Sequence, residues 1–153
     1  MTSLCCDVLK ALEGKTLATA ESCTGGMIGA ALTAVPGASK VYKGGIISYW
    51  SEVKQNLLNV DAEDLKNLGP VSMQVAASMA EGVRKALHAD IGISVTGLAG
   101  PEGDEFGRPV GTVFVGFDNG AKTVVKQHRF SGDREAVRRQ AVEAALQLIL
   151  EMN

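Results

Sequence analysis

The feature that most constrains this chain is an apolar run that breaks into polar residues and then into paired glycines. Residues Thr16–Ala20 are mostly apolar or β-branched and are typical of a strand. The polar residues Glu21-Ser-Cys-Thr24 interrupt the run, and Gly25-Gly26 opens a helical segment over Met27–Ala34. A strand that enters a helix through so short a turn favours an α/β fold.

The same turn has the features of an anion site. The first N–H groups of a helix have no partner within the helix, and with the helix dipole they attract an anion, most often phosphate. Gly25 and Gly26 let a ligand approach the backbone because they carry no Cβ. The segment is neither a Walker loop nor a Gly-x-Gly-x-x-Gly turn. The alternative is a plain strand-to-helix turn with Thr24 as the helix cap.

Helix and strand patterns alternate along the rest of the chain. The predicted helices are residues 3–13, a turn that carries Lys54, a segment from Asp61 to Gly69, a longer one capped by Ser72, and one opened by Asp133. The predicted strands are Gly44–Tyr49, Ile91–Thr96, Val110–Asp118 and Lys122–Phe130, the last two joined by the hairpin turn Asn119-Gly120. These elements predict a three-layer α/β/α sandwich around a mixed sheet with one C-terminal β-hairpin.

Composition narrows the class of protein. With 153 residues, 46% of them hydrophobic, the chain suits a single domain over residues 1–153. A formal net charge of −2 argues against broad nucleic-acid binding. No apolar run approaches the roughly 20 residues that span a bilayer, so we expect no membrane partner. The N-terminal residues lack a signal-peptide pattern, and we expect a cytoplasmic protein.

The cysteines and histidines predict no metal site and no cofactor. Cys5, Cys6 and Cys23 form no Cys-x-x-Cys pair, which argues against a disulfide framework and a structural zinc site. Cys23 lies beside a helix start, where a thiol pKa can fall, so a thiol nucleophile is one hypothesis. His88 and His128 have no catalytic or metal-binding neighbours in sequence, and we expect both to be structural.

Several short motifs occur in a fixed order over nearly the whole chain. They are Ala20-Glu-Ser-Cys-Thr-Gly-Gly26, Pro36-Gly-Ala-Ser39, Gly44-Gly45 through Tyr49 to Lys54, Gly69-Pro-Val-Ser72, Thr96-Gly-Leu-Ala-Gly-Pro101, Gly107-Arg-Pro-Val-Gly111 and Asp133-Arg134 to Arg138. Together they resemble the CinA C-terminal domain family, the bacterial nicotinamide mononucleotide amidohydrolases. Many members carry a molybdopterin-binding-like domain ahead of this one, and we expect none here because 153 residues leave no room for it.

The resemblance implies an activity and a homodimer. The activity is hydrolysis of nicotinamide mononucleotide to nicotinate mononucleotide and ammonia in pyridine nucleotide salvage, without metal or cofactor. Such chemistry needs a nucleophile, a proton shuttle and donors for the oxyanion. No Ser-His-Asp arrangement can be assigned, which favours a lysine base with a lowered pKa, and spacing alone does not say which lysine.

By resemblance, the catalytic residues are Ser39 as nucleophile, Lys54 as base and Tyr49 to orient the pair or relay a proton. Without the family resemblance, the expectation is that Ser39 caps a turn, Tyr49 belongs to a strand and Lys54 is a surface charge. The family usually reads Tyr-Ser-Asn before its lysine, whereas this chain reads Tyr49-Trp50-Ser51, so the contact made by the asparagine is in doubt. Trp50 covers the pocket or a subunit interface, or packs against the sheet edge.

The predicted substrate-binding residues come from three places. The helix start supplies hydroxyls and amides, a strand end supplies polar groups where open α/β sheets bind ligands, and the last helix supplies arginines that can grip phosphate. The resemblance slightly favours Arg138 over Arg134, and the alternative for both is a solvated basic face. The full set is Ser22, Thr24, Gly25, Gly26, Thr96, Gly97, Arg134 and Arg138.

Two other functions stay open at this point. One is a nucleotide-binding module that kept the fold and lost the reaction, against which the joint presence of Ser39, Tyr49 and Lys54 counts. The other is a hydrolase that uses Cys23, for which no base is assignable in sequence.

Overall fold

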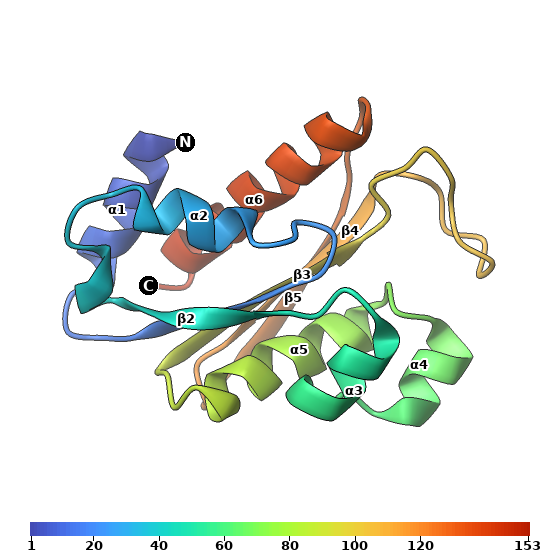
Figure 1. Ribbon diagram of the computed structural model, residues 1–153, viewed down its shortest axis with the longest axis horizontal. Helices are drawn as coiled ribbons and strands as arrows, with labels where there is room; N and C mark the ends of the chain where they lie inside the picture. The colour runs from blue at the N-terminus through green and yellow to red at the C-terminus, as the bar shows by residue number, and fades with distance from the viewer.

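The computed structural model describes all 153 residues, and it confirms the predicted three-layer α/β/α architecture (Figure 1). The strands are β1 (Leu17–Glu21), β2 (Tyr42–Ile47), β3 (Ile91–Gly97), β4 (Thr112–Asp118) and β5 (Thr123–Arg129). The helices are α1 (Thr2–Ala11), α2 (Met27–Thr33), the short 3-10 helix η1 (Ala38–Lys40), α3 (Ser51–Leu58), α4 (Ala62–Leu68), α5 (Met73–Ala86) and α6 (Arg134–Glu151).

The sheet is mixed, with strand order β2-β1-β3-β4-β5. Strands β2, β1 and β3 run parallel, whereas β4 and β5 form the predicted antiparallel hairpin. The C-terminal ends of the three parallel strands and the start of β4 therefore meet at one edge of the sheet. This edge is where open α/β sheets commonly bind ligands.

Helices cover both faces of the sheet. Helices α1, α2 and α6 lie on one face and α3, α4 and α5 on the other, as Figure 1 shows. The α6 face holds the larger core, which includes Val137, Ala141 and Leu148 at helical spacing. The α5 face holds a second core around Val75 and Met79. The apolar side chains that recur at helical spacing in the sequence are the ones that face the sheet.

Helix α5 approaches the backbones of β3 and β4 closely at two glycines. A Cβ on Gly92 of β3 would overlap the Ala80 carbonyl oxygen, and one on Gly116 of β4 would crowd that of Ala76. Glycine is therefore required where α5 crosses the centre of the sheet.

The helix caps predicted from sequence are confirmed. Asp61, Ser72 and Asp133 each accept a hydrogen bond from a backbone N–H in the first turn of α4, α5 and α6, at 2.7, 3.1 and 2.9 Å. No helix is both long and apolar enough to cross a membrane.

Candidate active site

Lys54 is the most unusual side chain of the molecule, because it is a lysine only 1% exposed. It projects from the first turn of α3 into the C-terminal edge of the sheet. Its Nζ donates to the carbonyl oxygens of Ser48 at 2.6 Å and Tyr49 at 3.2 Å, and to the hydroxyl of Ser22 at 2.9 Å. Every partner is neutral, and no carboxylate forms an ion pair with it.

This environment disfavours the ammonium form of Lys54. Burial lowers the pKa of the Lys54 amine to about 8, and Cys23 opposes the shift only in part. In the neutral amine, two N–H groups can stay on the carbonyls of Ser48 and Tyr49. The nitrogen lone pair then faces the Ser22 hydroxyl, which can donate its proton to it.

Ser22 is held at this position by the sheet. It follows β1 directly, its N–H donates to the Val95 carbonyl on β3 at 3.0 Å, and its side chain is buried. Lys54 follows the neighbouring strand β2. Because β1 and β2 are parallel, the residues after both strands meet at the same edge, and the two side chains come together there.

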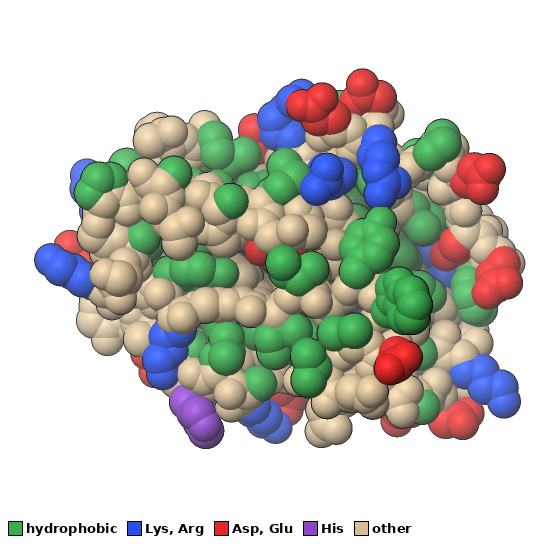
Figure 2. Space-filling view, in the orientation of Figure 1, with side chains coloured by type: hydrophobic (Ala, Val, Ile, Leu, Met, Phe, Trp, Pro, Cys, Tyr) green, Lys and Arg blue, Asp and Glu red, His purple; other side chains and the backbone are tan.

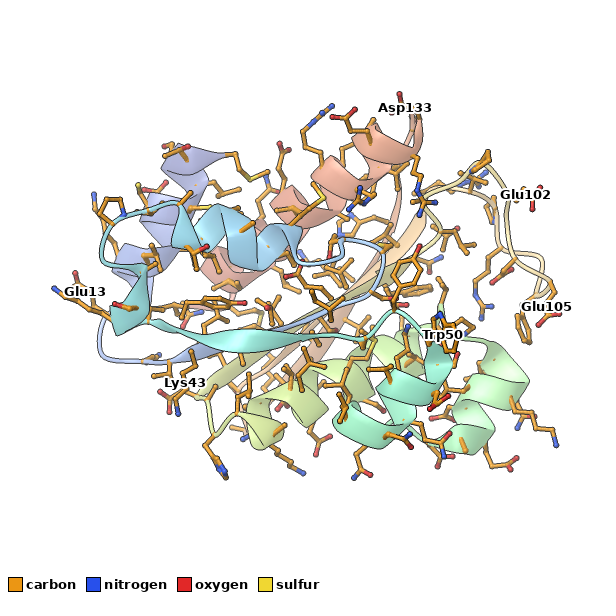
Figure 3. All side chains as sticks on the ribbon, in the orientation of Figure 1. Glu13, Lys43, Trp50, Glu102, Glu105 and Asp133 are labelled. Carbon is orange, nitrogen blue, oxygen red and sulfur yellow. The ribbon has the colours of Figure 1, made fainter.

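The Ser22–Lys54 pair lies at a cavity of about 220 Å³ between the strand ends and the loop after β3. In Figure 3, Trp50 at the start of α3 and Glu102 on that loop lie at this end of the sheet. The cavity is lined by Ser22, Cys23, Tyr49, Lys54, Pro70, Val71, Thr96, Gly97, Leu98, Ala99, Gly100, Glu102 and Arg134.

Arg134 brings positive charge to the rim of the cavity. Its guanidinium donates to the Gly100 carbonyl at 2.6 Å and to the Tyr49 hydroxyl at 3.0 Å. Figure 2 shows basic side chains beside hydrophobic ones on the face that is turned to the viewer. Ile47, Tyr49 and Trp50, between the end of β2 and the start of α3, are exposed large hydrophobic residues. Trp50 is 70% exposed, so it does not pack against the sheet edge.

The structure brings six of the predicted residues to this cavity and places five elsewhere. Those that line it are Ser22, Tyr49, Lys54, Thr96, Gly97 and Arg134. Those outside its lining are Ser39, Thr24, Gly25, Gly26 and Arg138.

Ser39 is the main correction. It is exposed in η1, before β2 begins, and lines a different cavity with Tyr42 and Lys43. The six residues of β2 carry the chain to the opposite edge, which at 3.3 Å per residue is about 20 Å away. The predicted Ser39–Lys54 pair therefore does not form, and Ser22 is the serine beside Lys54.

The start of α2 is a second correction, because it already holds an anion of the protein itself. The Glu21 carboxylate accepts from the Thr24 hydroxyl and the Ile28 amide, both at 2.8 Å, and from the Gly29 amide at 3.0 Å. These groups are not free for a phosphate. Thr24 is not the helix cap either, since Gly26 takes that position with φ of 105°. Glu21 is not among the residues predicted from the motifs, although an acid shortly before a helix start is a visible signal.

Arg138 reverses the predicted order of the two arginines. Its Nε donates to the Cys23 carbonyl at 2.9 Å and its Nη2 to the Thr24 carbonyl at 3.4 Å. Arg134 is the arginine that faces the cavity. Arg138, one turn further along α6, instead binds the backbone of the segment that follows β1.

The remaining candidates fit the site poorly. Cys23 lines the cavity but is 5% exposed, and burial raises the pKa of its thiol to about 11, which disfavours a thiolate nucleophile. Neither histidine lines the cavity, since His88 is exposed after α5 and His128 stacks on Phe130 along β5. No group of three or more His, Cys, Asp or Glu side chains is placed to hold a metal ion.

Known proteins resemble this chain over most of its length. The model of the CinA C-terminal domain matches residues 2–153. CinA-like proteins of Dictyoglomus turgidum and a Sulfurihydrogenibium strain are 49% and 48% identical over 82% and 88% of this chain. The chain spans about a third of their length, 31% and 34% respectively.

Solved structures agree with the sequence relatives. The competence damage-inducible protein A of Klebsiella pneumoniae has a TM-score of 0.96 at 40% identity, covering 98% of this chain and 94% of that one. A CinA superfamily protein of Escherichia coli has a TM-score of 0.97 at 35% identity, covering 99% and 90%. The chain therefore belongs to the CinA C-terminal domain family.

Proposed function

We propose that this protein is an amidohydrolase that converts nicotinamide mononucleotide and water to nicotinate mononucleotide and ammonia. The observation that carries the proposal is the 2.9 Å contact between Ser22 Oγ and the buried Lys54 Nζ, whose pKa is lowered to about 8. A serine nucleophile needs a base that is partly neutral at working pH, and this amine meets that requirement.

The reaction follows from the pair. Ser22 Oγ attacks the carboxamide carbon while its proton moves to the neutral Lys54 Nζ. Lys54 then gives that proton to the leaving nitrogen, ammonia departs, and an acyl-serine ester remains. Water attacks the ester with Lys54 again as base, the Ser22 oxygen recovers a proton from it, and the carboxylate product leaves.

The backbone amide of Cys23 is suited to the oxyanion of this reaction. The N–H groups of Cys23 and Thr24 follow the nucleophile directly, and neither donates to an acceptor within the protein; Cys23 lines the cavity, whereas Thr24 is buried behind it. Donors at this place relative to a nucleophile stabilise the charge that develops on the carbonyl oxygen.

Tyr49 contributes to the pair mainly through its backbone. Its carbonyl accepts from Lys54 Nζ, while its hydroxyl accepts from Arg134. The Tyr49 carbonyl therefore orients Lys54, and the Tyr49 side chain orients Arg134.

The choice of substrate rests on the family and on Arg134. A guanidinium has five N–H donors, and Arg134 uses two of its nitrogens on Gly100 and Tyr49, which leaves donors for a phosphate. Arg134 lies at the cavity rim at the start of α6. Its free donors therefore favour a substrate whose amide lies at Ser22 and whose phosphate lies near α6.

The test is ammonia release by the purified chain from nicotinamide mononucleotide, NAD, nicotinamide riboside and free nicotinamide. We expect the mononucleotide to be hydrolysed fastest and a Ser22→Ala variant to release none. Binding of the mononucleotide without ammonia release would contradict the proposal and indicate a nucleotide-binding module instead.

A further inference from the structure

The segment that carries Ser22 is a loop, and its conformation decides whether Ser22 Oγ reaches Lys54. Residues 22–26, which we call the nucleophile loop, belong to neither β1 nor α2. The hydrogen bond from the Ser22 N–H to Val95 fixes its first residue. Backbone bonds from the Gly25 N–H to the Ser22 carbonyl at 3.1 Å and from the Met27 N–H to the Thr24 carbonyl at 3.0 Å close its turns, and two side chains supply its remaining contacts.

Glu21 ties the loop to α2. The carboxylate is buried, with 2% of the residue exposed, and no lysine or arginine forms an ion pair with it. One oxygen joins the Thr24 hydroxyl to the Ile28 amide, and the other accepts from Gly29. Burying a carboxylate costs free energy unless hydrogen-bond donors satisfy it. The three donors do so here, which indicates that Glu21 has a structural role in the loop.

Arg138 donates hydrogen bonds to carbonyl groups of the same loop. Its guanidinium bonds the Cys23 and Thr24 carbonyls and lies against Gly25, where a Cβ would meet Nη2 at 3.5 Å. In a trans peptide the C=O and the following N–H point in opposite directions. By binding the Cys23 carbonyl, Arg138 therefore directs the Thr24 N–H away from itself.

We propose that Glu21 and Arg138 are positioning residues that fix the nucleophile loop, so that Ser22 Oγ stays on Lys54 Nζ. This inference rests on the proposed function. The carboxylate binds the donors of the loop and of α2, while the guanidinium binds the loop's acceptors. Thr24 is held by both, through its hydroxyl and its carbonyl. Neither residue lines the substrate cavity.

The test compares Arg138→Ala, Arg138→Lys and Glu21→Gln with Arg134→Ala in the ammonia-release assay. Loss of a charge-assisted contact that shapes the nucleophile should lower kcat about 10- to 100-fold in Arg138→Ala and Glu21→Gln, with KM changed less than about 3-fold. Arg134→Ala should instead raise KM. Millimolar guanidinium should restore part of the kcat of Arg138→Ala, whereas ammonium at equal ionic strength should not, and Arg138→Lys should lie between Ala and wild type.

A second readout does not depend on turnover. The Lys54 pKa can be followed by NMR titration of its Cε, and in Arg138→Ala and Glu21→Gln it should rise towards 10.5, because a released loop admits water. Asp61→Ala, which removes a helix cap away from the cavity, is the control for lost stability and should leave both kcat and this pKa unchanged.

The outcomes separate the two proposals. A wild-type protein that releases no ammonia refutes the proposed function alone, and the Lys54 titration still decides the positioning role. Variants at Glu21 and Arg138 that keep wild-type kcat and Lys54 pKa refute the positioning role, as does an Arg138→Ala variant that changes KM alone.

Discussion

Lys54 should make the stability of the protein depend on pH in a way that one substitution removes. The folded-state pKa is about 8, against 10.5 for an ordinary lysine. Between these values the unfolded chain binds a proton that the folded protein does not, so the free energy of unfolding rises with pH. Below pH 8 both states are protonated, and the folded state bears the cost of a buried ammonium.

The size of the effect follows from the shift. A difference of 10.5 − 8, or 2.5 pKa units, corresponds to about 3 kcal/mol, most of which should develop between pH 7 and pH 10. Lys54→Met should lack this rise. The difference in free energy of unfolding between wild type and Lys54→Met should therefore change in favour of wild type by about 2–3 kcal/mol over that range.

Urea unfolding followed by circular dichroism at pH 7, 8, 9 and 10 measures this difference. Lys66→Met, at an exposed lysine of α4, is the matched control and should show no such trend. If the difference in free energy of unfolding between wild type and Lys54→Met stays constant between pH 7 and pH 10, the lowered pKa of Lys54 is refuted.

Three further predictions concern catalysis. The kcat/KM for nicotinamide mononucleotide should rise with pH through an ionisation near 8, as Lys54 loses its proton, and a limb at 10 or above would count against Lys54 as base. Arg134→Ala should raise KM for the mononucleotide about 10- to 100-fold and bring its kcat/KM close to that of nicotinamide riboside, whereas an unchanged ratio would exclude a phosphate contact. Exhaustive chelation should leave ammonia release unchanged, and activity restored by added zinc or magnesium would contradict a Ser-Lys mechanism.

Local chemistry explains why much of the fold could be predicted. Asp61, Ser72 and Asp133 cap helices through contacts two or three residues away, so their signals lie within a short stretch of sequence. The turn at Asn119-Gly120 is equally local, with Gly120 at φ of 87°. The apolar spacing of α5 and α6 reports directly which side faces the sheet.

The candidate site depends on contacts that the sequence does not display. Ser39 and Ser22 are both serines in motifs, and only the direction of β2 puts Ser39 at the wrong edge. The amides at the start of α2 suit a phosphate or a carboxylate equally well, and the chain's own Glu21 takes them. Arg134 and Arg138 are one turn apart on the same face of α6, so the position at which the helix begins relative to the sheet decides which one reaches the cavity.

The most direct test of the Ser22–Lys54 pair is a comparison of two serine variants in one assay. Ammonia release from nicotinamide mononucleotide would be measured for wild type, Ser22→Ala and Ser39→Ala at equal protein concentration. Ser22→Ala should lose nearly all activity, because it removes the only serine hydroxyl bonded to Lys54, while Ser39→Ala should turn over at close to the wild-type rate. A Ser22→Ala protein that remains active, with Ser39→Ala inactive, would contradict the proposed site.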